Sequence, residues 1–334
     1  MIKYIGSKRK LLPAIASVVD SLGPLQSVLD LFAGTTRVGR MLKKRGYLVH
    51  SNDTAAWSEV LGRVAIALDR REVDDKSVSD LIEDLQSTPP QEGWFTKEYC
   101  SKARYIQPFN GAKIEAIRTR IEEEVTEEPL RSIALTSLLL AADKVDSTTG
   151  VQMAYLKSWA ARSYRPLLLE IPEMLDGPGS VSSVDAAQCA RDHGPVDLVY
   201  VDPPYNQHSY LGNYHLWETL LKFDDPETYG VACKRIDCKI RKSPWNSKRL
   251  IHGAFQDLVE AIDARWILVS FNNEGFLPAE DVEEVLSTRG EVTRTEIPHD
   301  RYVGARIGIH NPEGEKVGTI SHLKNTEYLF AVKS

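Results

Sequence analysis

The chain has 334 residues, of which 42% are hydrophobic and 26% are charged, and its formal net charge is −6. These values are ordinary for a globular protein, and the acidic balance excludes a uniformly basic body that binds polyanions over its whole surface. No apolar run approaches the roughly 18 residues of a membrane span, and the opening segment MIKYIGSKRK lacks the apolar core of a secretory signal. We therefore expect a cytoplasmic protein without a membrane segment.

The first part of the chain predicts a βαβ unit. An apolar run at 28–32 ends in Ala33-Gly34, a helical pattern continues to Gly46, and Asp53 closes a second strand-like run at 47–50. A strand, a glycine turn, a helix and a second strand are typical of a parallel sheet. The expected fold class is therefore α/β.

The middle of the chain has a different character. Apolar residues recur there at helical spacing, as at Ile114, Ile117 and Ile121, and strand-like runs are absent. We expect a largely helical insertion at 57–176, which divides a catalytic domain made of residues 1–56 and 177–334. Strand-like runs resume after the insertion at 180–184, 197–201, 266–271 and 327–332.

The four cysteines favour neither a disulfide scaffold nor a metal site. Such a scaffold is unusual in a chain that is long enough to bury a core of its own. Cys233, Cys238 and His252 could contribute to a zinc site, but a fourth ligand at useful spacing is not evident. We predict reduced thiols and no metal.

The sharpest functional signal is the tetrapeptide Asp202-Pro203-Pro204-Tyr205. It follows the run at 197–201, which is apolar on both faces, as expected of a strand between two helix layers. The tetrapeptide therefore stands at the carboxyl end of a parallel strand, where open α/β sheets bind their ligands. Its two prolines stiffen the turn and remove two backbone donors, which leaves carbonyl acceptors between an aspartate and an aromatic ring.

This combination suits the exocyclic amine of a nucleobase, which is a poor nucleophile because its lone pair is delocalised into the ring. The Asp202 carboxylate and the Pro203 carbonyl could hold the N–H bonds and favour a pyramidal nitrogen, whose lone pair then points at a methyl donor. Tyr205 could stack on a base removed from the duplex, at roughly 1–3 kcal/mol per stacked base, against a flipping cost of a few kcal/mol. The alternative is a proline-stiffened strand exit with an incidental aspartate.

The turn after the first strand, residues 30–39, is a weaker signal. Gly34 permits close approach of a ligand, and Asp53 lies 23 residues beyond Asp30, where an acid can bind the ribose hydroxyls of an adenosine cofactor. The turn is not G-x-G-x-x-G, since Thr36 stands where a further glycine would be expected, and this suits a cofactor without a pyrophosphate. A purely structural turn, with Asp53 as a helix N-cap, is the alternative.

A basic segment lies between Cys233 and His252, where seven lysines and arginines accompany a single acid. Such a segment on an acidic protein predicts a surface that faces a polyanion, and a solvated loop is the alternative. Trp245 within the segment could wedge or stack, although a packing role is favoured. The candidate DNA contacts are Lys239, Arg241, Lys242, Lys248 and Arg249, with Arg301 and Arg306 on an expected hairpin as a second group.

With these motifs in view, the chain resembles the adenine-specific (N6) DNA methyltransferase family typified by Dam. The resemblance covers about 1–56 and 180–334, where the opening segment 3–8, the turn at 30–39 and the tetrapeptide match the family's motifs in order. The continuation after the tetrapeptide looks especially like modification methylases of restriction systems. The resemblance implies a Rossmann-like methyltransferase fold with a mostly parallel twisted sheet, S-adenosylmethionine as the cofactor, and double-stranded DNA as the partner.

The resemblance also implies roles by position. Asp30 would hold the cofactor's amino group, Asp53 its ribose hydroxyls and Asp185 its adenine, with Tyr4 and Lys8 beside the methionine moiety. The residues implied in cofactor binding are Tyr4, Lys8, Asp30, Phe32, Gly34, Asp53, Asp185 and Asp202.

Some parts of the chain depart from the family pattern or stay open. Ala186 follows Asp185 where many relatives have phenylalanine, so the group that stacks on the cofactor's adenine is not identified. Asp185 could equally cap a helix. The insertion 57–176 matches nothing that can be transferred, although relatives often carry a target-recognition domain in this interval. Lys3 is implied to lie near the DNA.

The expected reaction is direct transfer of a methyl group to adenine N6 in double-stranded DNA after base flipping, with no metal and no covalent enzyme intermediate. The expected setting is a restriction-modification system, with a cognate endonuclease as a candidate partner and the oligomeric state open. Cytosine N4 and an amine of RNA or protein are rival targets, although enzymes for those usually carry serine or asparagine in place of Asp202. A catalytically silent DNA-binding subunit is the rival from another class, and a nicotinamide dehydrogenase would leave 202–205 unexplained.

Overall fold

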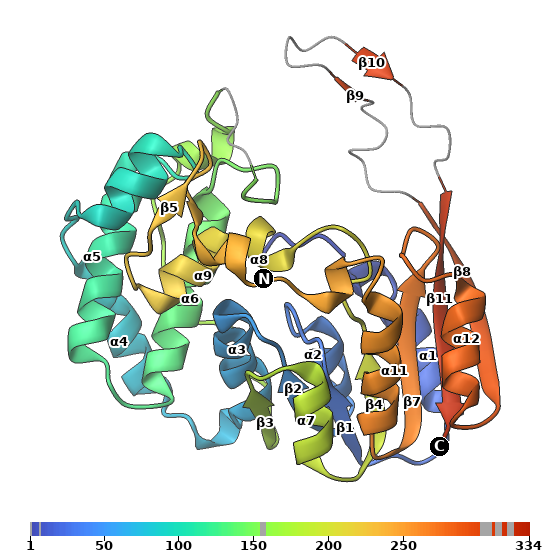
Figure 1. Cartoon of the computed structure of the whole chain (residues 1–334). Helices are drawn as coiled ribbons and strands as arrows, with labels where there is room; N and C mark the ends of the chain where they lie inside the picture. The colour runs from blue at the N-terminus through green and yellow to red at the C-terminus, as the bar shows by residue number, and fades with distance from the viewer. Residues whose placement is uncertain (1, 7, 154–157, 301–308, 311–315, 319–323) are drawn as a thin grey trace.

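The protein is built on one seven-stranded sheet with the strand order β3-β2-β1-β4-β7-β11-β8 (Figure 1). The computed structural model describes residues 2–6, 8–153, 158–300, 309–310, 316–318 and 324–334. All neighbouring strands are parallel except β11, which runs antiparallel to both β7 and β8. The expected α/β fold with a mostly parallel sheet is confirmed. The strands are β1 (Ser27–Asp30), β2 (Leu48–Asn52), β3 (Gly179–Ser182), β4 (Val196–Val201), β7 (Ala264–Asn272), β8 (Val292–Asp300) and β11 (Lys324–Lys333).

Strand β4 shows why the centre of the sheet is apolar on both faces. Consecutive side chains of a strand point to opposite sides, so Leu198 and Tyr200 join one hydrophobic cluster while Val199 and Val201 join another. The first cluster lies under α1 (Leu12–Ser21) and α2 (Arg37–Lys44). The second lies under α7 (Ala186–His193), α11 (Ile251–Ala261) and α12 (Ala279–Ser287).

A helical part covers the β3 edge of the sheet (Figure 1). Among the described residues between β2 and β3 no strand forms, as the helical spacing predicts. Its core also takes in Trp217 and neighbours from α9 (His215–Lys222), which follows the tetrapeptide in sequence. The helices of the insertion are α3 (Ala56–Gly62), a π-helix at Arg63–Ala67, a 3-10 helix at Arg70–Glu72, α4 (Asp75–Ser87), a π-helix at Thr96–Lys102, α5 (Pro108–Glu124), α6 (Leu130–Val145) and a 3-10 helix at Ala161–Tyr164.

Short elements complete the fold. A hairpin of β5 (Thr228–Tyr229) and β6 (Lys234–Arg235) follows α9, and β9 (Ile309–His310) pairs with β10 (Lys316–Gly318) near the C-terminal end. The remaining short helices are a 3-10 helix at Lys8–Lys10, α8 (Tyr210–Asn213), α10 (Asp237–Ile240) and a 3-10 helix at Pro244–Asn246.

Strand β8 was not expected from the sequence. Its residues 292–300 are mostly polar or charged and include Pro298, and the strand lies at the edge of the sheet, paired only with β11. Edge strands tolerate proline and polar residues because one side of the strand makes no ladder. The strand therefore lacks the continuous apolar run by which the central strands are found.

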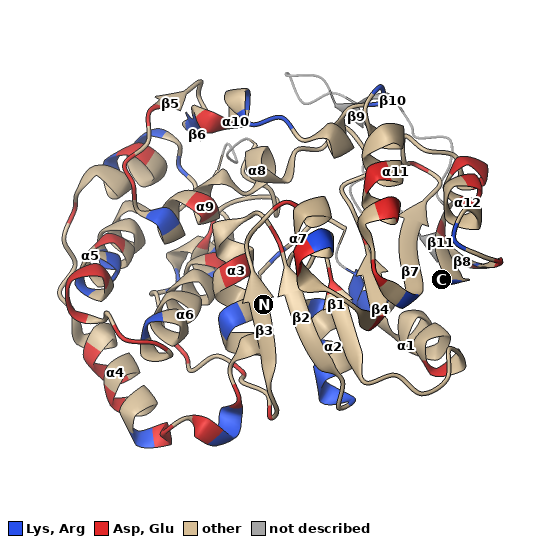
Figure 2. Cartoon of the chain, turned by 60° about the horizontal axis from the view of Figure 1, so that its bottom comes forward, with Lys and Arg blue, Asp and Glu red and all other residues tan. Residues whose placement is uncertain are grey.

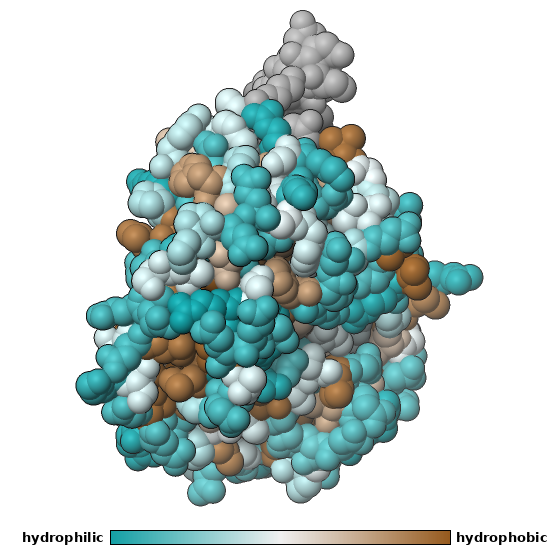
Figure 3. All heavy atoms as spheres, turned by 90° about the vertical axis from the view of Figure 1, so that its left-hand side faces the viewer, coloured by the Kyte–Doolittle hydropathy of each residue, from teal (hydrophilic) through white to brown (hydrophobic). Residues whose placement is uncertain are grey.

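The surface of the helical part is mainly hydrophilic. Figure 3, which views the molecule from the side of α4 and α5, shows its apolar side chains in small separate groups. In the described part of the chain, no helix combines the length and the apolar character needed to cross a membrane.

Candidate functional site

A cavity of about 300 Å³ opens where strands β1, β2, β3 and β4 end. Because these strands are parallel, their carboxyl ends meet at one edge of the sheet, and the segments that follow them supply the walls. Gly34 and Asp53 come from the first two of these segments, and Asp185 and Asp202 come from the other two. Four residues that the sequence predicted from separate motifs therefore share one cavity.

The turn after β1 brings the backbone close to this cavity. Gly34 has φ +49°, a conformation that favours glycine, and a Cβ added there would lie 3.1 Å from the hydroxyl oxygen of Tyr4. Thr36, which stands where a further glycine was expected, takes the same left-handed region with φ 58°. The turn thus keeps the glycine-type backbone without the second glycine.

Asp30, the last residue of β1, is a buried carboxylate with spare bonding capacity. It is 1% exposed, and its Oδ1 has no hydrogen-bond partner among the described residues. Backbone N–H groups of Phe32 and Gly39 donate to this carboxylate. Burial, followed by the nearby charges of Asp202 and Asp53, raises its pKa to about 8. Such a group is suited to receive a cationic ligand atom.

Asp53 ties the ends of β1 and β2 together rather than capping a helix. Its Oδ2 accepts from the Gly34 N–H at 2.8 Å, and its Oδ1 accepts from the Ala55 N–H at 3.0 Å. The N-cap residue of α3 is Ala55, so the N-cap alternative for Asp53 is wrong. Burial raises the pKa of Asp53, and each of its oxygens retains a lone pair for a further donor.

Asp185 combines the two roles that the sequence left open. Its Oδ1 accepts from the backbone N–H groups of Ala187 and Gln188, which makes it the N-cap of α7. It also lines the cavity, together with Ala186 and Asn52. The Asn52 side chain donates to the Val184 carbonyl at 3.0 Å and so fixes the loop that carries Asp185.

The tetrapeptide follows β4, the neighbour of β1 in the sheet. Asp202 and Pro204 line the cavity, whereas Tyr205 is buried beside them, 9% exposed. The Tyr205 ring packs on Phe271 with the ring centroids 5.2 Å apart. Its hydroxyl accepts a hydrogen bond from Asn272 Nδ2 at 2.9 Å.

Lys8 provides a counter-charge for the tetrapeptide. Its Nζ lies 3.0 Å from Asp202 Oδ1, and the lysine side chain is only 6% exposed. Burial raises the pKa of Asp202 to about 6, against the lowering effect of Lys8. Lys8 therefore contacts Asp202 of the tetrapeptide.

Two aromatic side chains that were not among the predicted site residues, Trp57 and Tyr210, line the cavity with Tyr4. The Tyr4 ring stacks on Tyr210 and Tyr214, with centroid separations of 5.2 and 4.9 Å, and Trp57 packs at 5.5 Å. Tyr210 and Trp57 line the cavity as Tyr4 does. Tyr210 belongs to the segment after the tetrapeptide that resembles modification methylases, so the sequence could have indicated it. No sequence pattern around Trp57 predicts a site residue, because it lies in an ordinary helix.

The basic segment supplies part of the cavity wall, and Figure 2 shows its blue stretches at α10 and in the loop beside it. Arg241, Lys242 and Trp245 line the cavity, and Asn246 donates to the backbone carbonyls of residues 206 and 208, just beyond the tetrapeptide. Trp245 is 6% exposed and meets Phe32 edge-on at 5.2 Å, so it packs as favoured. Five side chains of the segment are exposed and form no ion pair within the described residues: Lys239, Arg241, Lys242, Lys248 and Arg249.

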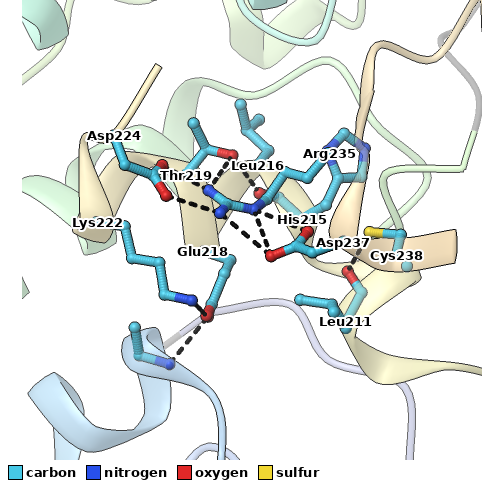
Figure 4. A network of polar contacts seen from close by, with 12 residues as sticks. Leu211, His215, Leu216, Glu218, Thr219, Lys222, Asp224, Arg235, Asp237 and Cys238 are labelled. Carbon is cyan, nitrogen blue, oxygen red and sulfur yellow. Dashed lines mark hydrogen bonds and ion pairs between the residues drawn. The ribbon is translucent and has the colours of Figure 1, made fainter. Parts of the chain in front are cut away.

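One basic residue of the segment serves the fold instead (Figure 4). Arg235 of β6 is 4% exposed, binds both oxygens of Asp224 at 2.7 Å and also contacts Asp237. Beside it, Glu218 of α9 accepts from the Ala56 N–H at 2.9 Å, at the start of the helix that follows Asp53. These contacts hold the helical part against the rim of the cavity.

Lys3 is not among the residues that line the cavity. Lys3 Nζ forms ion pairs with Asp143 at 3.0 Å and Asp146 at 3.1 Å. Arg301 and Arg306 lie outside the described residues. Within the described residues no cluster of three or more histidine, cysteine or acidic side chains could hold a metal ion, and all four cysteines are free.

Comparison with known proteins agrees with this site. The family profile of the D12 class N6 adenine-specific DNA methyltransferases matches residues 4–271. The type II methyltransferase M.NlaIII of Neisseria lactamica is 31% identical to this chain, over 96% of this chain and 98% of its own length.

Two further relatives are longer proteins. The modification methylase StsI of Streptococcus sanguinis is 31% identical over 91% of this chain and 49% of its own length. The modification methylase LlaI of Lactococcus lactis subsp. lactis is 30% identical over 85% of this chain and 48% of its own length. The chain thus spans about half the length of these two relatives, and the expected resemblance to modification methylases is confirmed.

Proposed function

The chain belongs to the D12 class N6 adenine-specific DNA methyltransferases, and we propose that it methylates adenine N6 in double-stranded DNA as the modification enzyme of a restriction system. The observation that carries the proposal is the shared cavity, whose walls include Asp30, Asp53 and Asp202. The same cavity therefore has groups for a cofactor, at Asp30 and Asp53, and a group for an amine, at Asp202. The proposed place of action is the cytoplasm.

The residues of the cavity fit S-adenosylmethionine. The unpaired Oδ1 of buried Asp30 would accept from the cofactor's amino group, whose positive charge stabilises the ionised carboxylate. Asp53, already oriented by two backbone donors, would accept from the ribose hydroxyls. The left-handed turn at Gly34 and the ring of Tyr4 would enclose the methionine moiety. When bound, the cofactor supplies an electrophilic methyl group.

We assign the grip on the adenine amine to the tetrapeptide. Lys8 holds Asp202 Oδ1, so Oδ2 is the oxygen left to accept an N6–H, and the Pro203 carbonyl supplies a second acceptor on a stiff turn. These bonds orient the nitrogen lone pair and cost little reorganisation at the moment of reaction. The ionised form of Asp202 is the one that accepts the amine hydrogen. Tyr205 is the proposed stacking partner of the base.

The DNA would lie over the mouth of the cavity. The exposed cations of the basic segment, with Arg241 and Lys242 at the cavity edge, would contact phosphates that flank the flipped base. We propose the helical part, residues 57–176, as the target-recognition domain, since Glu218 and its neighbours fix it beside the same rim. A cognate endonuclease is the proposed partner of the system.

Mapping of the methylated positions tests the assignment to a restriction system. The gene would be expressed in a bacterial strain that has no adenine methylase, and N6-methyladenine would be located by sequencing of its genomic DNA. A single short recognition sequence, modified at nearly all of its occurrences, is expected. Scattered methylation without a consensus sequence would contradict the restriction-system assignment, because such a system must protect every site that its nuclease cuts.

A further inference from the structure

A buried glutamate on β11 connects the two ends of the tetrapeptide. Glu327 is 7% exposed and lies directly opposite Asn272 in the antiparallel pairing of β11 with β7. Its Oε1 accepts from Asn272 Nδ2 at 3.4 Å, and the same Nδ2 donates to the Tyr205 hydroxyl at 2.9 Å. One arm of the contact network therefore leads from Glu327 to Tyr205.

The other arm leads to Asp202. Glu327 Oε2 lies 3.6 Å from Lys8 Nζ, which in turn lies 3.0 Å from Asp202 Oδ1. Within the described residues Glu327 Oε2 has no hydrogen-bond partner of its own. Its polar neighbour is the ammonium group of Lys8. The ammonium group of Lys8 is thus held between two carboxylates and is not drawn wholly onto Asp202.

Burial of the Glu327 carboxylate is unfavourable for the stability of the folded protein. A buried carboxylate without full hydrogen bonding loses its hydration, and a single ion pair offsets that loss only in part. A glutamine at the same place would bond to Asn272 equally well and would carry no charge. The charge itself therefore needs an explanation, and its position next to Lys8 supplies one.

We propose that Glu327 is a positioning residue that acts through Lys8 on Asp202 and through Asn272 on Tyr205, so that both ends of the tetrapeptide are held for the adenine. The inference rests on the proposed function, since it concerns the groups assigned to the base. Glu327 and Asp202 share the ammonium group of Lys8. One oxygen of Asp202 is therefore fixed, while the Asp202 carboxylate stays basic enough to hold the amine. By orienting Asn272, Glu327 holds the Tyr205 ring at its hydroxyl.

Several titratable groups face Asp202 from the packed elements around it. They are Lys8 before α1, Asp30 of β1, Tyr200 of β4, Tyr210 of α8, Glu327 of β11, and Tyr4 and Tyr205 in the loops. Burial raises the pKa of Asp202, the charge of Lys8 lowers it, and the charge of Glu327 raises it further. Removal of the Glu327 charge should therefore shift the acid limb of the methylation rate to lower pH.

The test is single-turnover methyl transfer by the full chain to double-stranded DNA, measured against pH for the wild type and Glu327→Gln. We expect the rate to fall at least tenfold at neutral pH, the acid limb to shift to lower pH, and the S-adenosylmethionine Kd to stay within twofold. Glu296→Gln, on the neighbouring strand β8 with a side chain 54% exposed, is the matched control and should behave as the wild type. A Glu327→Gln rate within twofold of the wild type, or a slower rate with an unmoved acid limb, would overturn the proposal.

Asn272→Ala tests the second arm and does not depend on the folding of the first variant. It removes the bond to the Tyr205 hydroxyl without a change of charge, so the rate should fall while the acid limb stays in place. An unchanged rate would refute this arm. Failure of the proposed function is distinguishable, because the wild type itself would then transfer no methyl group to adenine and the variants would have no reference rate.

Discussion

Replacement of Asp30 by asparagine should make the ligand-free protein more stable at alkaline pH while it abolishes cofactor binding. Asp30 is buried, its Oδ1 has no partner, and its pKa in the folded protein is about 8 instead of 3.8. A group whose pKa is raised on folding contributes its stability below the unfolded-state pKa and loses it as the pH rises through the folded-state pKa. The loss for Asp30 therefore extends from about pH 4 to about pH 8.

The size of the effect follows from the shift. At 1.36 kcal/mol per pKa unit, the three units between about pH 5 and about pH 8 correspond to about 4 kcal/mol as an upper limit, part of which is shared with the coupled carboxylates of Asp53 and Asp202. The uncharged amide of the Asp30→Asn variant removes this dependence. The free energy of unfolding, measured by urea denaturation at about pH 5 and about pH 8.5, should therefore fall less steeply with pH in the variant than in the wild type.

Two comparisons complete the test. S-adenosylhomocysteine, which retains the amino group, should flatten the pH dependence of the wild type and should not bind to the variant. Asp197→Asn is the matched control, because hydrogen bonds from the backbone of Gln26 and Ser27 lower the pKa of Asp197, so this variant should be less stable than the wild type at alkaline pH. An Asp30→Asn variant that is less stable than the wild type at about pH 8.5 would refute the view that burial makes the ionised form of Asp30 unfavourable.

Three other perturbations should act on the same site. Gly34→Ala places a Cβ at φ +49° and 3.1 Å from Tyr4, so calorimetry should show at least a tenfold loss of cofactor affinity in a protein whose circular dichroism is unchanged. The wild-type methylation rate should rise with pH through about 6, because the carboxylate form of Asp202 accepts the amine hydrogen, and a flat profile in single-turnover assays between about pH 5 and 7 would contradict that role. Arg241→Gln should lower the salt slope of DNA binding by about 0.9, whereas Lys76→Gln, whose lysine pairs with Asp80 on α4, should leave the slope unchanged in anisotropy titrations.

The parts of the fold that the sequence predicted are those with a strong local pattern. Strand β4 and the turn after β1 were found because an apolar run and a glycine carry their meaning within a few residues. Strand β8 was missed because an edge strand needs no apolar run. Thr36 shows a finer limit, since it takes a left-handed conformation that its residue type disfavours.

The residues of the site also differ in whether a local sequence pattern reveals them. Asp30, Asp53 and Asp202 were found because each closes a strand, and parallel strands end at one edge. Glu327 stands 125 positions beyond Asp202 and reaches the tetrapeptide only through the register of β11 on β7, which no local pattern reveals. Arg235 shows the reverse case, because a basic residue within a predicted DNA-facing segment is buried in ion pairs instead.

The central claim is that this cavity transfers a methyl group to adenine N6 and that Asp202 holds the amine. The most direct measurement incubates the purified protein with methyl-labelled S-adenosylmethionine and unmethylated DNA of mixed sequence, and then identifies the labelled nucleosides by mass spectrometry, with Asp202→Ala in parallel. The account predicts labelled N6-methyldeoxyadenosine from the wild type and none from the variant, although both bind the cofactor. Label on cytosine, or equal labelling of adenine by the variant, would contradict it.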